Sequence, residues 1–364
     1  MADRYDIIVV GAGPAGSLYA LLTARAGFRV LLLDREFFPR NRICNGILHP
    51  DAHRILKETG LWESFQKLPS SQITTVEFSA EDDGGVSAPL ALAGYFESTV
   101  SRTLFDEWLR SEAEAAGADF LPGVSVRSFE GRKELITSEG DFEADLFIGA
   151  DGRRSWMARA SGLASHLGSC NRIAWQSILP EEVLEEGPVH IKFFQEGYFG
   201  VNRQGGGSAN LCMLLNRHSF DTPQMIIDRY FENLPPLGWS STYPVSRPIN
   251  KAAENKVILI GDAARLLEPF TGEGITMALY TAQTAAHVTI NSKMPDGTYR
   301  DLEKKYRKKH RALYQSMKVY NGLSRWLALS PYRGIFAAKV AKRLPFLLNY
   351  AARDFLPGQS LIKE

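Results

Sequence analysis

The sequence predicts an α/β protein in which a parallel β-sheet is interrupted by an inserted mixed β-sheet and followed by a helical C-terminal segment. Three observations support this fold class. A glycine-rich turn joins two buried-strand patterns near the N-terminus, strand-like runs break the strand–helix alternation in the middle, and a basic helical pattern ends the chain. We expect a discontinuous first domain over residues 1–70, 96–165 and 250–295, a β-sheet domain over 71–95 and 166–249, and a helical segment over 296–364.

The composition is that of a globular protein without a strong overall charge. Of the 364 residues, 45% are hydrophobic, and 42 lysines and arginines nearly balance 41 acidic residues, which argues against nucleic acid as a partner. The cysteines at positions 44, 170 and 212 form no disulfide or metal framework, and the seven histidines show no ligand spacing. We therefore expect free thiols, no metal and a cytoplasmic location. The N-terminal apolar run reads as a strand rather than a signal peptide.

Residues 5–34 have the pattern of a nucleotide-binding unit. YDIIVV is typical of a strand buried on both faces, and the next six residues, Gly11 to Gly16, match GxGxxG. The three glycines allow a tight turn, backbone approach to a pyrophosphate and close helix packing. A helix pattern then ends at Gly27, and the buried strand FRVLLLD ends in Asp34, which would accept hydrogen bonds from an adenosine ribose. The sequence thus predicts a Rossmann-like domain, with an ordinary glycine turn as the alternative.

Two later segments extend the pattern. ADLFIGADG reads as a strand with an Asp-Gly turn at Asp151, and KVILIGDAARLLEPFTGEGI reads as a strand ending at Asp262, a loop and a helix start. With three motifs in this order, residues 1 to about 295 resemble the FAD-dependent superfamily of aromatic hydroxylases (class A flavoprotein monooxygenases) and geranylgeranyl reductases. PFTGEGI and the segment Cys44-Asn45-Gly46 look more like the geranylgeranyl reductase branch, which typically has Cys-Gly-Gly there.

The resemblance implies an FAD-dependent oxidoreductase and assigns residues to parts of the cofactor. These are Gly11, Gly13, Ala15 and Gly16 at the pyrophosphate, Asp34, Arg35 and Val126 at the adenosine, Arg102 and Asp262 at the ribityl chain or pyrophosphate, and Cys44, Asn45, Ile47, Gly272, Gly274 and Ile275 at the isoalloxazine ring. Asp151 is either a further cofactor contact or a residue that suits a tight turn. No second GxGxxG follows a strand, so NAD(P)H, if it is the electron donor, would bind transiently.

The inserted sheet carries the expected substrate pocket. NRIAWQSILP, PVHIKFFQ, GYFGVN and SANLCMLLN read as successive strands that join strands near 72–90. The reductase branch usually has tyrosine-x-tryptophan-x-phenylalanine-proline here, whereas this chain keeps Tyr198 but has Gly200, Asn202 and Arg203 at the other places. This departure either makes the pocket larger and more polar, which suits an aromatic or polyketide-like substrate, or is ordinary strand variation.

The C-terminal segment is helical, basic and aromatic. Apolar residues recur at helical spacing at Leu313, Met317, Tyr320, Leu323 and Leu327. One interpretation is a helical pair packed on the FAD domain with a solvated basic face, and the other is peripheral contact with an anionic membrane surface. No run approaches the ~20 apolar residues of a spanning helix. The sequence does not indicate an oligomeric state.

Three functions fit this sequence. The first is reduction of a carbon–carbon double bond in a hydrophobic, isoprenoid-type substrate by hydride transfer from reduced FAD. The second is NAD(P)H- and oxygen-dependent hydroxylation of an aromatic or polyketide-like substrate, and the third is a non-catalytic flavin-binding redox partner. We expect Cys44 to touch the isoalloxazine ring or the substrate and to act in proton delivery, although a buried packing role is the alternative. Arg40 and Arg42 would favour its thiolate if their side chains point inward.

Overall fold

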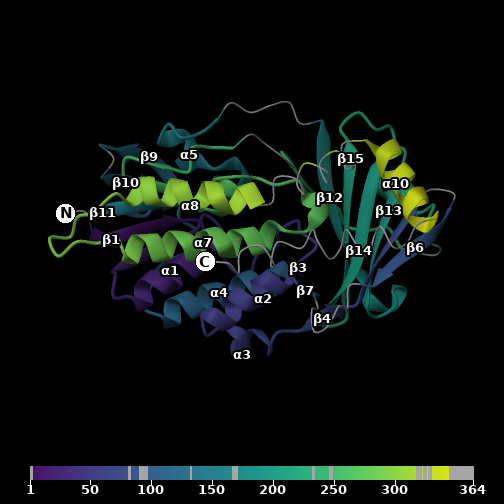
Figure 1. Cartoon of the computed structure of the whole chain (residues 1–364), viewed down its shortest axis with the longest axis horizontal. Helices are drawn as coiled ribbons and strands as arrows, with labels where there is room; N and C mark the ends of the chain where they lie inside the picture. Colours follow the sequence, from purple (N-terminus) through teal and green to yellow (C-terminus); the bar gives the residue numbers. More distant parts are fainter. Residues whose placement is uncertain are drawn as a thin grey trace.

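One half of the molecule contains an eight-stranded sheet with a parallel centre (Figure 1). Strands β18, β11, β1, β2 and β8 lie side by side and parallel, while β17, β10 and β9 are added antiparallel. The strands are β1 (Asp3–Val10), β2 (Val30–Leu33), β8 (Asp119–Leu121), β9 (Val126–Glu130), β10 (Glu134–Thr137), β11 (Gly140–Gly149), β17 (Ala253–Glu254) and β18 (Val257–Leu259). The computed structural model describes residues 3–80, 83–89, 97–131, 133–165, 171–231, 234–245, 249–316, 322, 326 and 330–343.

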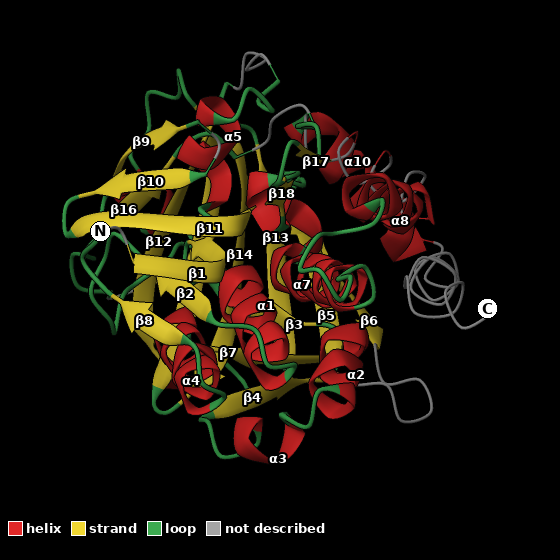
Figure 2. Cartoon of the chain, turned by 90° about the vertical axis from the view of Figure 1, so that its left-hand side faces the viewer, coloured by secondary structure: helices red, strands yellow, loops and turns green. Residues whose placement is uncertain are grey.

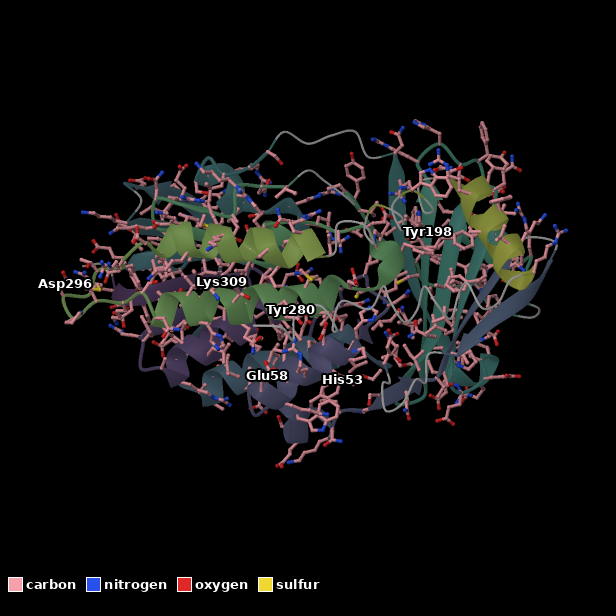
Figure 3. All side chains as sticks on the ribbon, in the orientation of Figure 1. His53, Glu58, Tyr198, Tyr280, Asp296 and Lys309 are labelled. Carbon is pink, nitrogen blue, oxygen red and sulfur yellow. The ribbon has the colours of Figure 1, made fainter. Side chains whose placement is uncertain are left out.

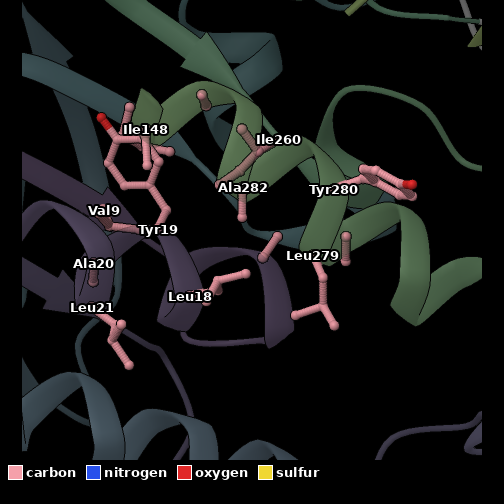
Figure 4. Close-up of a cluster of buried hydrophobic side chains, with 14 of the residues drawn as sticks. Val9, Leu18, Tyr19, Ala20, Leu21, Ile148, Ile260, Leu279, Tyr280 and Ala282 are labelled. Carbon is pink, nitrogen blue, oxygen red and sulfur yellow. The ribbon is translucent and has the colours of Figure 1, made fainter. Parts of the chain in front are cut away.

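Apolar side chains on both faces of this sheet explain its burial. Along β1, Ile7 and Val9 contribute to the core on one face, and Ile8 and Val10 to the core on the other. The first face is covered by α1 (Pro14–Arg25), α4 (Arg102–Ala115) and α7 (Gly274–Ile290), as Figure 2 shows. Leu18 of α1 and Leu279 of α7 meet in this core (Figure 4). The predicted Rossmann-like arrangement is therefore confirmed.

The other half contains a seven-stranded sheet in the order β16-β12-β15-β14-β13-β5-β6. All its neighbours are antiparallel except β13 and β5. The strands are β5 (Thr75–Ala80), β6 (Asp83–Pro89), β12 (Arg172–Pro180), β13 (Pro188–Phe194), β14 (Gly197–Gly205), β15 (Ser208–Asn216) and β16 (Ser240–Thr242). The short helix α6 (Pro223–Ile227) adds Ile226 and Ile227 to the core of this half.

A small three-stranded sheet accompanies these two sheets. It consists of β3 (Ile47–Leu48), β7 (Glu97–Val100) and β4 (Ser70–Ile73). Residues 72 and 73, which we expected in the inserted sheet, pair instead with β7. Their place follows from the chain path, because β7 lies between β3 and β4 and presents one edge to each. Helices α2 (Pro50–Glu58) and α3 (Trp62–Phe65) lie near these strands, whereas α5 (Trp156–Ala160) contacts β11 of the eight-stranded sheet.

Helices α8 and α10, in the described part of the C-terminal segment, pack on different halves. Helix α8 (Leu302–Ser316) lies along α7 and buries Leu302, Tyr306, His310 and Tyr314, which recur every fourth residue. Helix α10 (Pro331–Arg343) packs instead against β5, β6 and β13 of the seven-stranded sheet. Of the expected apolar series, Leu313 packs against the first core, whereas residues 317, 320, 323 and 327 lie outside the described residues.

Candidate functional site

One continuous cavity of about 850 Å³, lined by described residues, runs from the first glycine turn to the seven-stranded sheet. Its size is that of small-molecule and cofactor sites. Every residue that we assigned to FAD lines this cavity except Gly16. The residues brought together are Gly11, Gly13, Ala15, Asp34, Arg35, Cys44, Asn45, Ile47, Arg102, Val126, Asp151, Asp262, Gly272, Gly274 and Ile275. They come from segments that are far apart in the sequence, and their roles at FAD remain predictions.

The glycine turn has a shape that side chains would fill. Gly11 has φ +105°, and a Cβ there would lie 2.5 Å from the carbonyl oxygen of Ala150. A Cβ on Gly16 would lie 1.8 Å from the carbonyl oxygen of Gly11, which explains why Gly16 supports the turn from behind rather than lining the cavity. Gly13 caps α1 without a side-chain hydrogen bond, and the first turn of α1 has no acid. The free backbone N–H groups and the helix dipole at this end suit a pyrophosphate.

Asp34 lines the cavity, and its carboxylate also forms hydrogen bonds and an ion pair with other residues of the protein. Its carboxylate accepts hydrogen bonds from the backbone N–H groups of Ala12 (2.8 Å) and Glu36 (3.0 Å). It also pairs with the buried guanidinium of Arg40 at 3.1 Å. Arg40 lines the cavity close to Gly13, and its Nε atom is buried without a hydrogen-bond partner among the described residues. A positive charge therefore stands beside the proposed pyrophosphate position, a contribution that our sequence interpretation did not assign to FAD.

The adenosine end of the cavity is more open. Arg35 is exposed and Val126 is half-buried at the start of β9. Asp151 is held inside its own turn, because its carboxylate accepts hydrogen bonds from Ser155 Oγ and from the backbone N–H groups of Trp156 and Met157. Burial raises the pKa of Asp151, although these hydrogen bonds oppose the shift. The Asp-Gly turn therefore has a clear structural function at the start of α5.

Cys44 is adjacent to Arg102 rather than to the arginines that we expected. Arg42 pairs with Glu36 at 2.8 Å and Arg40 pairs with Asp34, so neither is directed at the thiol. Arg102 makes two 2.8 Å hydrogen bonds to Asp106 and also interacts with Cys44. Burial alone would lower the pKa of Arg102, but Asp106 and Cys44 outweigh it and raise that pKa. A permanently charged guanidinium therefore lies beside Cys44.

The loop before α7 closes the cavity between the two halves. Gly272 has φ +69°, and a Cβ there would lie 3.1 Å from Cδ1 of Ile47. The preceding Glu268 forms a buried double hydrogen bond with Arg172 of β12, at 2.9 and 2.7 Å. This pair ties the loop to the seven-stranded sheet. Gly274 and Ile275 then begin α7, and their position at its N-terminus would stabilise negative charge on a neighbouring ring.

Of the three residues expected to form the substrate pocket, only Tyr198 lines the cavity. Figure 3 shows Tyr198 on the seven-stranded sheet. Its ring packs against Phe193 and Phe270, and burial raises its pKa well above the ordinary value. Gly200 and Asn202 lie behind the lining, because the segment around Asn45 covers them. Our placement of these two residues in the pocket surface is thus corrected by the structure.

These features are typical of a dinucleotide-binding protein, with one cavity that extends from the glycine turn to the seven-stranded sheet. Residues 4–215 match the family model described as FAD binding domain. The chain belongs to this family, and it is an FAD-dependent oxidoreductase. The glycine turn, the uncapped start of α1 and the unpartnered Nε of Arg40 are consistent with FAD in the cavity.

Several proteins are similar over most of their length. The chain is 27% identical over 340 residues to digeranylgeranylglycerophospholipid reductase 1 of Methanococcoides burtonii, covering 86% of this chain and 81% of the relative. It is 29% identical over 318 residues to menaquinone reductase of Mycobacterium tuberculosis, covering 79% and 76%. Among solved structures, the flavin-dependent brominase Bmp2 has a TM-score of 0.80 with 20% identity and coverage of 98% and 94%. A geranylgeranyl bacteriochlorophyll reductase-like protein of Thermoplasma acidophilum has a TM-score of 0.76 with 22% identity and coverage of 98% and 97%.

Proposed function

We propose that the protein reduces a carbon–carbon double bond of a hydrophobic, isoprenoid-type substrate. The observation that carries this proposal is the position of Cys44 and Arg102, which line the same cavity between the glycine turn and the aromatic wall at Tyr198. Relatives named digeranylgeranylglycerophospholipid reductase and menaquinone reductase support this substrate class. Bound FAD would supply the hydride, which is the chemistry that this cofactor brings to a protein.

The residues of the chain would bind the cofactor, orient the substrate and supply the proton. The glycine turn, the start of α1 and Arg40 would hold the pyrophosphate, while the start of α7 would stabilise negative charge at the ring. Tyr198 gives the far wall of the cavity an aromatic surface, and Phe193 and Phe270 pack against its ring without lining the cavity. The Cys44 thiol would give its proton to the second carbon of the double bond, and Arg102 would stabilise the thiolate that is left. Hydride plus proton balances the saturation of one double bond.

The test of this function is single turnover without oxygen. Dithionite-reduced holoprotein, mixed anaerobically with an isoprenoid panel, should be reoxidised by an alkene substrate, as followed by flavin absorbance. A hydroxylase would not turn over until oxygen is admitted. Hydroxylation is the second candidate, because Asn45 adds a polar amide to the cavity lining. If no member of the isoprenoid panel reoxidised the flavin under nitrogen, the reductase proposal would be abandoned.

NAD(P)H is our proposed electron donor, bound transiently. Arg153, Arg154 and Arg159 all line the cavity, and within the described chain none of them forms an ion pair with a carboxylate. Such a cationic rim suits a phosphate-bearing dinucleotide.

We retain a cytoplasmic location as a prediction, which the free thiols of Cys44 and Cys212 support.

Replacing Cys44 by alanine should slow anaerobic single turnover by roughly 10²- to 10⁴-fold, the usual contribution of a positioned proton donor. FAD content should stay close to the wild-type value, because the substitution leaves the glycine turn and Asp34, assigned to the pyrophosphate and adenosine, unchanged. Stopped-flow absorbance measures the rate, and the absorbance ratio of the purified protein measures FAD. Cys44→Ser should recover part of the rate. Normal turnover in Cys44→Ala would leave Cys44 with only a packing role.

We also propose peripheral contact with an anionic membrane through α10. The described helices include none that is long and apolar enough to cross a membrane. Gly334 and Ile335 face the seven-stranded sheet, and a Cβ on Gly334 would lie 2.2 Å from the Phe193 ring. Tyr332 and Phe336 are 66% and 64% exposed, beside exposed basic residues such as Arg333. Aromatic and basic side chains together suit a lipid interface.

Full-length holoprotein should float with vesicles containing phosphatidylglycerol and much less with pure phosphatidylcholine. Replacing both Tyr332 and Phe336 by serine should lower partitioning by at least about tenfold, because their apolar surface no longer enters the interface. Phe220→Ser is the matched control, since Phe220 is fully exposed on the loop after β15. Absence of wild-type flotation on anionic vesicles would remove the membrane proposal.

A further inference from the structure

A row of carboxamide side chains connects the seven-stranded sheet to the segment that contains Cys44. The buried members are Gln176 of β12, Asn202 and Gln204 of β14, and Asn210 of β15. Asn202, Gln204 and Asn210 bond directly to Asn45, which lines the cavity next to Cys44, and Gln176 reaches it through Asn210. Asn202 and Gln204 donate hydrogen bonds to the backbone carbonyl of Asn45, at 3.3 and 3.5 Å. The sheet therefore fixes the backbone of this one residue from two positions.

The direction of the hydrogen bonds fixes the side chain of Asn45 as well. Gln176 Nε2 donates to Asn210 Oδ1, which leaves the NH₂ group of Asn210 turned towards Cys44 and Asn45. That NH₂ group donates to the carbonyl oxygen of Cys44 at 3.3 Å and to Asn45 Oδ1 at 2.9 Å. Because Asn45 Oδ1 must face a donor, its Nδ2 atom points the other way. The hydrogen-bond network thus selects one of the two possible orientations of the Asn45 amide.

Asn45 Nδ2 is left as an unused donor on a residue that lines the cavity. Among the described residues it has no hydrogen-bond partner, although Asn45 Oδ1 and the backbone oxygen are both bonded. Gly200 makes room for this group, since a Cβ at Gly200 would lie 3.0 Å from Asn45 Nδ2. The two departures from the reductase pattern, asparagine at 45 and glycine at 200, therefore meet at one point. A larger residue at 200 would displace the amide.

The network costs stability, which argues that it serves binding. Gln176 Oε1 and Asn202 Oδ1 are buried without a hydrogen-bond partner in the part of the chain that the structure describes. Each such atom lowers the free energy of unfolding, and apolar side chains would fill the same positions without this loss. A buried polar network of this kind is useful, despite the lower stability, when it holds a functional group in one orientation.

We propose that Asn45 Nδ2 donates a hydrogen bond to a carbonyl oxygen of the substrate. The substrate would then be an alkene conjugated to a carbonyl group, rather than a pure hydrocarbon chain. This inference rests on the proposed reduction of a double bond and adds the recognised oxygen. A hydrogen bond to that oxygen would stabilise the charge that accumulates there when hydride adds to the far carbon, and Cys44 would then protonate the near carbon. Asn210 is the positioning residue for Asn45.

The test compares two ten-carbon isoprenoids, citral, which has a conjugated aldehyde, and myrcene, which has no oxygen. Dissociation constants are measured with oxidised holoprotein from changes in the flavin absorbance. Wild type should bind citral about tenfold more tightly than myrcene, as expected for one hydrogen bond. Asn45→Ala, reconstituted with FAD before the titration, should abolish this preference by weakening citral alone. Asn210→Leu should reduce the preference although Asn45 is still present, and the exposed Asn216→Ala on the same strand should retain it.

Three outcomes would overturn this inference. They are equal or absent binding of citral and myrcene by wild type, equal weakening of both ligands in Asn45→Ala, and loss of FAD from Asn45→Ala, which would assign the donor to the cofactor. Binding to oxidised protein needs no turnover. A failure of the proposed reduction would therefore appear only in the anaerobic reoxidation experiment, and the two results are read separately.

Discussion

Gly16→Ala should yield protein that retains almost no FAD after purification. A Cβ at this position would lie 1.8 Å from the carbonyl oxygen of Gly11, so the backbone of the turn must move. The shift would misdirect the N–H groups at the start of α1 that suit the pyrophosphate. FAD content is measured from the ratio of absorbance at the flavin and protein maxima, and circular dichroism reports whether the apoprotein is folded.

Gly238→Ala is the matched control for this substitution. Gly238 has no atom within 4 Å of an added Cβ and does not adopt a positive φ. Its replacement should therefore leave FAD content at the wild-type value. A Gly16→Ala protein that kept its full FAD content would show that the turn is not the pyrophosphate site.

Arg172→Met should lower the free energy of unfolding by about 3–5 kcal/mol, because it leaves the buried carboxylate of Glu268 without its partner. The pair joins β12 to the loop that precedes Gly272, so we also expect weaker FAD binding. Urea denaturation of the holoprotein measures the first effect, and FAD titration of the apoprotein measures the second.

The surface pair Arg4–Asp145 provides the comparison. Its atoms approach to 3.1 Å, but the Arg4 side chain is 69% exposed, so Arg4→Met should cost less than about 1 kcal/mol. Combining Arg172→Met with Glu268→Leu should recover much of the lost stability, since no unpaired charge remains buried. If Arg172→Met and Arg4→Met lowered the free energy of unfolding by the same small amount, the buried pair would not be the link between sheet and loop that we describe.

The sequence was most informative where one short segment determines its own structure. GxGxxG with its flanking strand and helix predicted β1, α1 and the turn between them, and Gly27 predicted the helix end. The alternation of strands and turns between 172 and 216 likewise predicted β12 to β15. Local backbone preferences and apolar patterns decide such elements, and both can be read from neighbouring residues.

The features of the site that the sequence did not predict depend on contacts between residues far apart in the chain. The pairing of Arg172 with Glu268 and the convergence of Asn210 on Asn45 join residues 96 and 165 positions apart. Nothing in the local pattern around Arg40 indicated that it would pair with Asp34 instead of approaching Cys44. Gly200 and Asn202 were misplaced for the same reason, because the segment that covers them is remote in the sequence. A departure from a family pattern at both 45 and 200 was the one available signal.

The most direct test of the proposed reaction is the mass of the product formed without oxygen. Reduced holoprotein should convert a substrate with a conjugated double bond into a product heavier by two hydrogen atoms, and Cys44→Ala should form it far more slowly. A product that appears only after oxygen is admitted and is heavier by one oxygen atom would contradict the account and identify a hydroxylase.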